Sequence, residues 1–113
     1  MDNMSEDAFQ SKCYMWFHHE YPELRGLLCY NLNNSKHKVR AMMDKGMGLQ
    51  KGRSDMVFYY DARAYMIELK VGKNDQLDDQ IEWQKKIERA GFYYCIIRTL
   101  EDFQMVIKNI IDK

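Results

Sequence analysis

Two acidic residues and a lysine stand out for the chemistry that they could do together. Asp55 stands at the start of one apolar run, and Glu68 and Lys70 lie within the next, separated by Leu69. Carboxylate oxygens are ligands that Mg²⁺ and Mn²⁺ prefer, and such an ion supplies much of the charge stabilisation that phosphodiester hydrolysis needs. A neighbouring ammonium could orient or deprotonate the attacking water, or offset developing negative charge. These residue types indicate a metal-dependent hydrolytic centre.

Two strands joined by a short connection would bring these residues together. Residues 55–60 have the composition of a strand, and residues 61–64 are few enough for a hairpin connection. Alternation along residues 65–71 would then direct Glu68 and Lys70 to one face of the sheet. The backbone carbonyl of Leu69 could add a third oxygen ligand. The commonest alternative for such a pattern is a surface ion pair, because short motifs have many false positives.

Two further polar residues fall on predicted helices near this centre. Ser5 starts a helix that ends at Tyr21-Pro22, and Glu6 falls at the start of its apolar stripe, where it could hold a water molecule on the ion or a second ion. Gln80 lies on the inner arc of a helix from about 76 to 90. That inner arc is predicted to include Leu77, Ile81, Gln84 and Ile87. The ordinary alternatives are a helix-terminal charge for Glu6 and a surface amide for Gln80.

The remaining sequence predicts an α/β chain with the element order α-β-(α)-β-β-α-β-α. Residues 27–31 are expected to form a short strand, and residues 36–45 a helix that Gly46 and Gly48 stop. Residues 92–98 are almost continuously apolar, which is typical of a strand covered on both faces. Thr99 can cap a last helix, whose inward residues would be Phe103, Val106, Ile107 and Ile110.

Length and composition favour one domain spanning residues 1–113. Hydrophobic residues make up 46% of the 113 residues, which is enough for a single core. No apolar run approaches the roughly 18 residues of a membrane span, and the first residues lack the basic start of a signal peptide, so we expect a cytoplasmic protein without a membrane partner. The three cysteines are widely spaced and are expected to be buried reduced thiols: Cys13, Cys29 and Cys95.

Basic residues gather in one stretch although the overall charge is balanced. The chain has 17 Lys plus Arg against 17 Asp plus Glu. Between residues 36 and 53, however, six basic residues face only one acid, Asp44. Such a stretch could neutralise DNA phosphates, and its ordinary alternative is a solvated helix face. The residues expected to contact DNA are Lys36, Lys38, Arg40, Lys51 and Arg53.

Taken together, these motifs resemble the PD-(D/E)xK nuclease superfamily, and within it the virus-type replication-repair nuclease (VRR-NUC) family in its small stand-alone form from phages and bacteria. The resemblance runs over essentially the whole chain. It is carried by the segments Ser5–Gln10, Trp16-Phe17 with Tyr21–Leu24, Gly52–Asp55, Ile67–Lys70, Leu77-x-x-Gln80-x-x-Trp83 and Ala90–Phe92. Two departures are Ser54, where the superfamily has proline, and residues 33–36, where the family usually has an Asn-Gly turn before a basic residue.

The resemblance implies a restriction-endonuclease-like core, a central mixed sheet flanked by helices, and a Mg²⁺- or Mn²⁺-dependent DNA endonuclease. Stand-alone members act as homodimers on branched DNA such as the Holliday junction, which suggests a role in DNA repair. In this chain the implied metal ligands are Asp55, Glu68, the Leu69 carbonyl and Glu6, with Lys70 assisting the water and Gln80 positioning Lys70 or the substrate. Two other hypotheses remain: a nuclease on linear or single-stranded DNA, and a catalytically inactive DNA-binding module on the same fold.

Overall fold

Four strands form a sheet in which each strand pairs with its neighbours in chain order. The computed structural model describes residues 4–31 and 38–113, without the side chains of residues 38–41. The strands are β1 (Leu28–Tyr30), β2 (Met56–Tyr60), β3 (Arg63–Leu69) and β4 (Tyr93–Ile97). The first three run antiparallel to one another, whereas β4 is parallel to β3. A parallel neighbour needs a crossover, and α3 (Asp78–Arg89) provides it.

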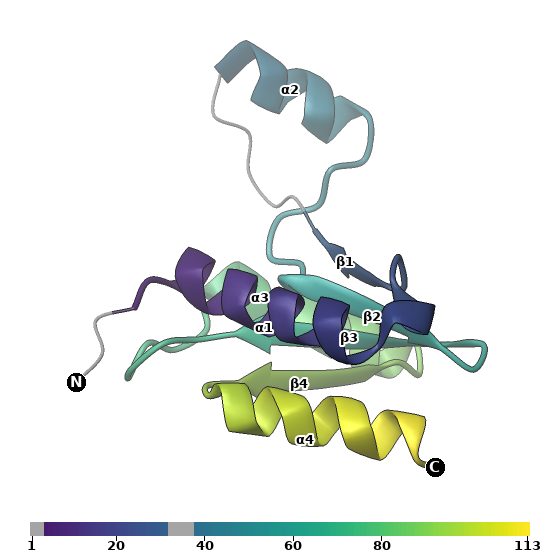
Figure 1. Cartoon of the computed structure of the whole chain (residues 1–113). Coiled ribbons are helices and arrows are strands. Elements are labelled where there is room, and N and C mark those ends of the chain that lie inside the picture. The colour runs from purple at the N-terminus through teal and green to yellow at the C-terminus, as the bar shows by residue number, and fades with distance from the viewer. Residues whose placement is uncertain (1–3, 32–37) are drawn as a thin grey trace.

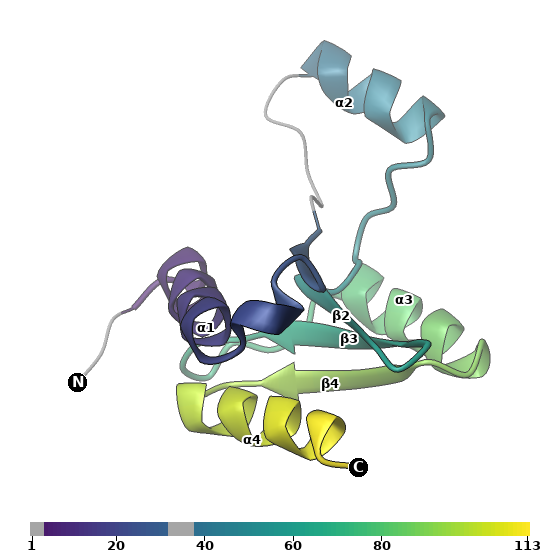
Figure 2. The same ribbon diagram turned by 45° about the vertical axis from the view of Figure 1, so that its right-hand side comes forward.

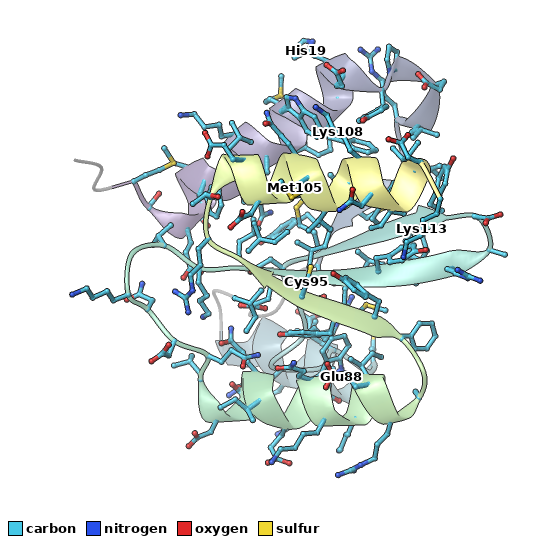
Figure 3. All side chains as sticks on the ribbon, turned by 90° about the horizontal axis from the view of Figure 1, so that it is seen from below. His19, Glu88, Cys95, Met105, Lys108 and Lys113 are labelled. Carbon is cyan, nitrogen blue, oxygen red and sulfur yellow. The ribbon has the colours of Figure 1, made fainter. Side chains whose placement is uncertain are left out.

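Helices cover both faces of this sheet (Figures 1 and 2). One face packs against α1 (Glu6–Glu20) and α4 (Leu100–Ile111), and α3 lies on the other. Seen from below, α4 and α3 lie on opposite sides of β4 (Figure 3). The architecture is the predicted α/β arrangement with the predicted element order, to which the structure adds a 3₁₀ turn, η1 (Pro22–Leu24). No helix in the described part of the chain is long and apolar enough to cross a membrane.

Strand alternation divides the buried residues between two cores of unequal size. The larger core joins alternate strand residues such as Phe58 and Ile67 to Phe17 of α1 and Phe103 of α4. The smaller core, on the α3 face, consists of Val57, Met66 and Tyr94, with Ala64, Trp83 and Ile87 packed against it. Most of the hydrophobic stabilisation therefore lies on the α1 and α4 side, and the α3 face has room for polar groups.

Helix α2 (Lys38–Gly46) stands away from the sheet (Figure 1). It confirms most of the helix that was predicted for residues 36–45, although Lys36 lies outside the described residues. Its methionines are exposed: Met42 by 71% and Met43 by 53%.

Some predictions of burial were wrong. Leu77, just before α3, and Ile81 within it were predicted to face inward but are exposed by 65% and 36%. The helix turns Trp83 toward the sheet, along with Gln80 and Ile87, which were predicted to lie on its inner arc. β4 has helices on both faces, α3 and α4, as predicted, but it is a sheet-edge strand, and Tyr93 and Ile96 remain partly exposed. Cys29 is also exposed, because β1 is the other edge strand, whereas Cys13 is buried and Cys95 half-buried.

The β2–β3 connection is tighter than the predicted span of residues 61–64. Register continues to the pair Tyr60 and Arg63, which leaves only Asp61 and Ala62 in the turn. Both have left-handed backbone angles, with φ of 53° and 62°. A two-residue hairpin turn of type I′ requires this conformation at both positions, and glycine adopts it without steric cost.

We expect Ala62→Gly to stabilise the protein. A left-handed alanine costs roughly 1–2 kcal/mol, so its removal should raise the free energy of unfolding by about 1 kcal/mol in urea denaturation. The control is Ala64→Gly, within β3, which should lower the free energy by roughly 0.5–1 kcal/mol. Equal effects of the two substitutions would contradict the turn assignment.

Candidate active site

The end of β3 carries a buried carboxylate and a buried ammonium on the same face. Glu68 has no exposure to water and Lys70 is 4% exposed. The Lys70 Nζ lies 3.6 Å from the Glu68 Oε2. Both residues share the α3 face with Met66, as the alternation predicted. Glu68 near the end of β3 and Lys70 directly after it thus place a carboxyl group and an ammonium group together inside the fold.

Asp55 joins this pair from the start of β2. One of its carboxylate oxygens, Oδ2, accepts a hydrogen bond from the Leu69 backbone N–H at 2.7 Å. The register that pairs Met56 with Ile67 places Asp55 beyond the paired residues, at the edge where Glu68 lies. The hairpin therefore brings the two carboxylates together, as the sequence predicted.

Gly52 allows the loop before Asp55 to lie directly against α3. Its φ is +80°, and a Cβ at this position would overlap the Asp79 carbonyl group, lying 2.6 Å from the carbonyl carbon. The loop is fixed further by the buried Ser54, whose hydroxyl donates to the Met56 carbonyl at 3.0 Å. A glycine is required here both by the backbone angle and by the approach of the helix.

Gln80 connects the ammonium and the carboxylate. Its Oε1 accepts from the Lys70 Nζ at 3.0 Å and from the Leu77 backbone N–H at 2.8 Å. Its Nε2 donates to the Glu68 Oε2 at 3.1 Å. Because two donors point at the Oε1 atom of Gln80, the orientation of its side-chain amide is fixed. The amide nitrogen is therefore the atom that faces Glu68. The first turn of α3 thereby holds both charged groups in place.

Glu6 approaches from the first turn of α1. Its Oε2 lies 4.0 Å from the Lys70 Nζ, and its side chain is 36% exposed. Glu6, Asp55 and Gln80 line one open hollow of about 280 Å³, to which Asp7 and Asp79 also contribute. The structure thus brings together all five residues predicted for catalysis: Glu6, Asp55, Glu68, Lys70 and Gln80.

The site has more carboxyl groups than ammonium groups. Burial raises the pKa of Glu68 to about 8, and the Asp55 carboxylate raises it as well, while Lys70 opposes the shift. Burial also raises the pKa of Asp55, against the hydrogen bond from Leu69. Each of these carboxyl groups makes ionisation of the other less favourable. A bound cation would offset this repulsion, so the arrangement suits a cation-binding site.

The donor set fits a hard divalent cation held by few side chains. Among residues 4–31 and 38–113, no group of three or more Asp, Glu, His or Cys side chains is arranged to hold a metal ion. A metal here would rest on the carboxylates of Asp55 and Glu68, with the Leu69 carbonyl as the predicted third ligand. Oxygen donors of this kind suit Mg²⁺ and Mn²⁺, which also keep several water ligands.

Two contacts of the site were not foreseen from the sequence. The Tyr94 hydroxyl lies 3.5 Å from the Glu68 Oε1, and burial raises the pKa of this tyrosine, so that it remains protonated. The buried Asn31, at the end of β1, donates to the Ser54 carbonyl at 3.0 Å and lines the hollow. No motif marks either residue, because the strand register that places them depends on the assembled sheet.

The predicted DNA-binding residues have different surroundings. Arg53 donates to the Oδ1 of Asn31, which places its guanidinium beside the hollow. Lys51 is exposed in the same loop. Lys38 and Arg40 belong to α2, which stands away from the sheet (Figure 1), and their side chains lie outside the described part, as does the whole of Lys36. Of the two whose side chains the structure describes, Lys51 and Arg53, it is Arg53 that contacts a residue lining the hollow.

Comparisons with known proteins support the fold. No family model matches the chain, and no curated protein matches it. Among solved structures, it is similar to a VRR_NUC domain protein with a TM-score of 0.81 and 19% sequence identity, over 99% of this chain and 92% of that chain. The chain therefore has the restriction-endonuclease-like fold of the family that its sequence resembles, with the mixed sheet and flanking helices that were predicted.

The raised pKa of Glu68 predicts how stability depends on pH without metal. The protonated carboxyl stabilises the fold fully below its ordinary pKa of 4.5, and this contribution is lost as the pH rises through about 8. In EDTA, the free energy of unfolding should therefore fall between about pH 5 and pH 8, by up to about 1.4 kcal/mol per pH unit. Urea denaturation should show this slope for the wild type and a much smaller one for Glu68→Gln. Glu88→Gln, on the exposed face of α3, is the control and should retain the slope.

Gly52→Ala tests the contact between the loop and α3. Gly48 is the matched control, because its φ is +101° but no atom lies within 4 Å of a Cβ built there. Alanine at either position costs roughly 1–2 kcal/mol for the left-handed backbone. Gly52→Ala should cost about 1–3 kcal/mol more because of overpacking. Urea denaturation measures both, and equal losses would mean that the loop moves away from α3 without cost.

Proposed function

We propose that this chain is a Mg²⁺- or Mn²⁺-dependent DNA endonuclease of the VRR-NUC type. The observation that carries the proposal is the hydrogen-bonded chain Glu68–Gln80–Lys70 beside Asp55, on a fold shared with a VRR_NUC domain protein. A carboxyl and an ammonium group kept in contact away from solvent, with a second carboxyl group beside them, are costly for stability, so their presence favours a chemical role.

In this proposal Asp55 and Glu68 would hold the metal, with the Leu69 carbonyl and, through a water molecule, Glu6. The ion would supply positive charge to the phosphate and a more acidic water. The excess of carboxylates over ammonium groups in the hollow supports this assignment.

Lys70 would act on the attacking water. Its Nζ is fixed by the Gln80 Oε1 and the Glu68 Oε2, and Glu6 lies 4.0 Å away, so the ammonium cannot swing into solvent. From this position it would orient the water or stabilise the negative charge that develops as the phosphorus–oxygen bond breaks. Gln80 would hold Lys70 without adding charge.

The proposed substrate is branched DNA, such as a Holliday junction, cut by a homodimer. A two-fold dimer presents two equivalent centres to two equivalent strands, and sedimentation velocity would detect it. Arg53 beside the hollow and the basic residues of the α2 region would contact phosphates. The intact set of carboxylates and lysine favours catalysis over a DNA-binding module without activity. Clustered carboxylates alone do not strengthen the binding of a DNA phosphate, because both groups are negatively charged.

Cleavage assays with matched lysine variants test the proposal. Four-way junction, flap, linear duplex and single-stranded DNA are incubated with wild type in Mg²⁺, Mn²⁺ or EDTA. We expect cleavage with metal, none in EDTA, and preference for the junction. Lys70→Ala should lower the rate roughly 100-fold or more, as loss of a group acting on the water does. Lys73→Ala changes an exposed lysine in the following loop and should retain activity.

Each outcome tests a different part of the proposal. If wild type cuts no substrate with either metal, the nuclease assignment is wrong. If it cuts linear duplex as fast as the junction, the selectivity for branched DNA is wrong. Equal rates for Lys70→Ala and Lys73→Ala would exclude the role given to Lys70.

A further inference from the structure

The two oxygens of Glu68 have different partners. Oε2 accepts from Gln80 and lies beside the Lys70 ammonium, as described above. Oε1 faces the opposite way, toward the Tyr94 hydroxyl at 3.5 Å. A carboxylate held at both oxygens has a defined plane, whereas one held at a single oxygen can rotate about its terminal bond.

The ring of Tyr94 is fixed by packing. It is 8% exposed and belongs to the small core on the α3 face. It packs against Trp83, with ring centroids 6.2 Å apart, and its register partner is Met66, two residues before Glu68. Cys95, the next residue, points to the opposite face, toward α4 (Figure 3). The hydroxyl can therefore approach Glu68 from one direction only.

Gln76 determines which way the Tyr94 hydroxyl donates. The Gln76 Nε2 donates to the Tyr94 oxygen at 3.1 Å, and also to the Gln84 Oε1 at 2.9 Å. A tyrosine hydroxyl has a single hydrogen, and accepting from Gln76 leaves that hydrogen for Glu68. The loop before α3 thus sets the direction of a hydrogen bond that ends on the candidate metal ligand.

We propose that Tyr94 is a positioning residue, which fixes the plane of the Glu68 carboxylate for metal binding, and that Gln76 directs its hydroxyl. This inference rests on the proposed function. Partners behind a metal ligand orient it, and their loss typically weakens metal binding 10–100-fold. Tyr94 touches neither substrate nor metal in this role, and acts through Glu68.

Direct Mn²⁺ binding tests the inference without relying on activity. Isothermal titration calorimetry on wild type and Tyr94→Phe should show Mn²⁺ binding weakened about 10-fold in the variant. The Mg²⁺ concentration for half-maximal cleavage should rise by a similar factor, while the rate at saturating Mg²⁺ changes little. Tyr93→Phe is the control, because it removes a hydroxyl from the neighbouring residue on the other face of β4, and it should bind Mn²⁺ as wild type does.

A second variant distinguishes positioning from packing. Gln76→Ala leaves the Tyr94 ring in place but removes its orienting donor, so it should also weaken Mn²⁺ binding. Added to Tyr94→Phe, it should have little further effect, because the two residues act through one hydrogen bond. If the double variant instead weakened Mn²⁺ binding by the product of the two single factors, the two residues would act independently, which would contradict the proposed contact from Gln76 through Tyr94 to Glu68.

The failures of the two proposals are distinguishable. If wild type binds Mn²⁺ and cuts DNA but both variants bind Mn²⁺ unchanged, the positioning role is wrong and the nuclease proposal stands. The same conclusion follows if Tyr94→Phe lowers only the unfolding midpoint. If wild type neither binds Mn²⁺ nor cuts DNA, the proposed function is wrong and the inference is overturned with it.

Discussion

A carboxylate with no access to water is the constraint around which this structure is organised. Burying the charged forms of Glu68 and Lys70 would cost on the order of several kcal/mol each, which direct partners must offset. Those partners come from separate parts of the chain: Gln80 from the first turn of α3, Tyr94 from β4 and Glu6 from α1. Helix α3 therefore cannot rotate or slide without leaving a buried charge unpaired.

The unequal cores explain how the fold tolerates this arrangement. The α1 and α4 face joins the largest buried aromatic residues, including Phe17, Phe58 and Phe103, in one continuous core. The α3 face buries far less apolar surface and holds the polar network instead. Stability and the candidate chemistry thus depend on opposite faces of one sheet. Natural proteins commonly keep such destabilising buried polar groups at their binding and catalytic sites.

Much of the candidate site could be predicted because it depends on local geometry. Strand alternation places Glu68 and Lys70 together, and a short hairpin brings Asp55 beside them whichever helices cover the sheet. The exposure of Leu77 and Ile81 could not be predicted in this way. A polar Gln80 turns inward to reach charged partners, so the buried face of α3 departs from its apolar periodicity. Tyr94 was missed for a related reason, since the parallel register of β3 and β4 is set by long-range packing.

The separation of α2 from the sheet bears on how proteins of this fold can diversify. Residues 38–46 form a helix apart from both cores, and the chain continues from it to β2 through the loop containing Gly52 (Figure 1). Substitutions, insertions or replacement of this helix would leave the packing behind Glu68 unchanged. Surface recognition can therefore evolve there independently of the reactive groups, and a transplanted α2 would be a practical route to altering what the same centre acts upon.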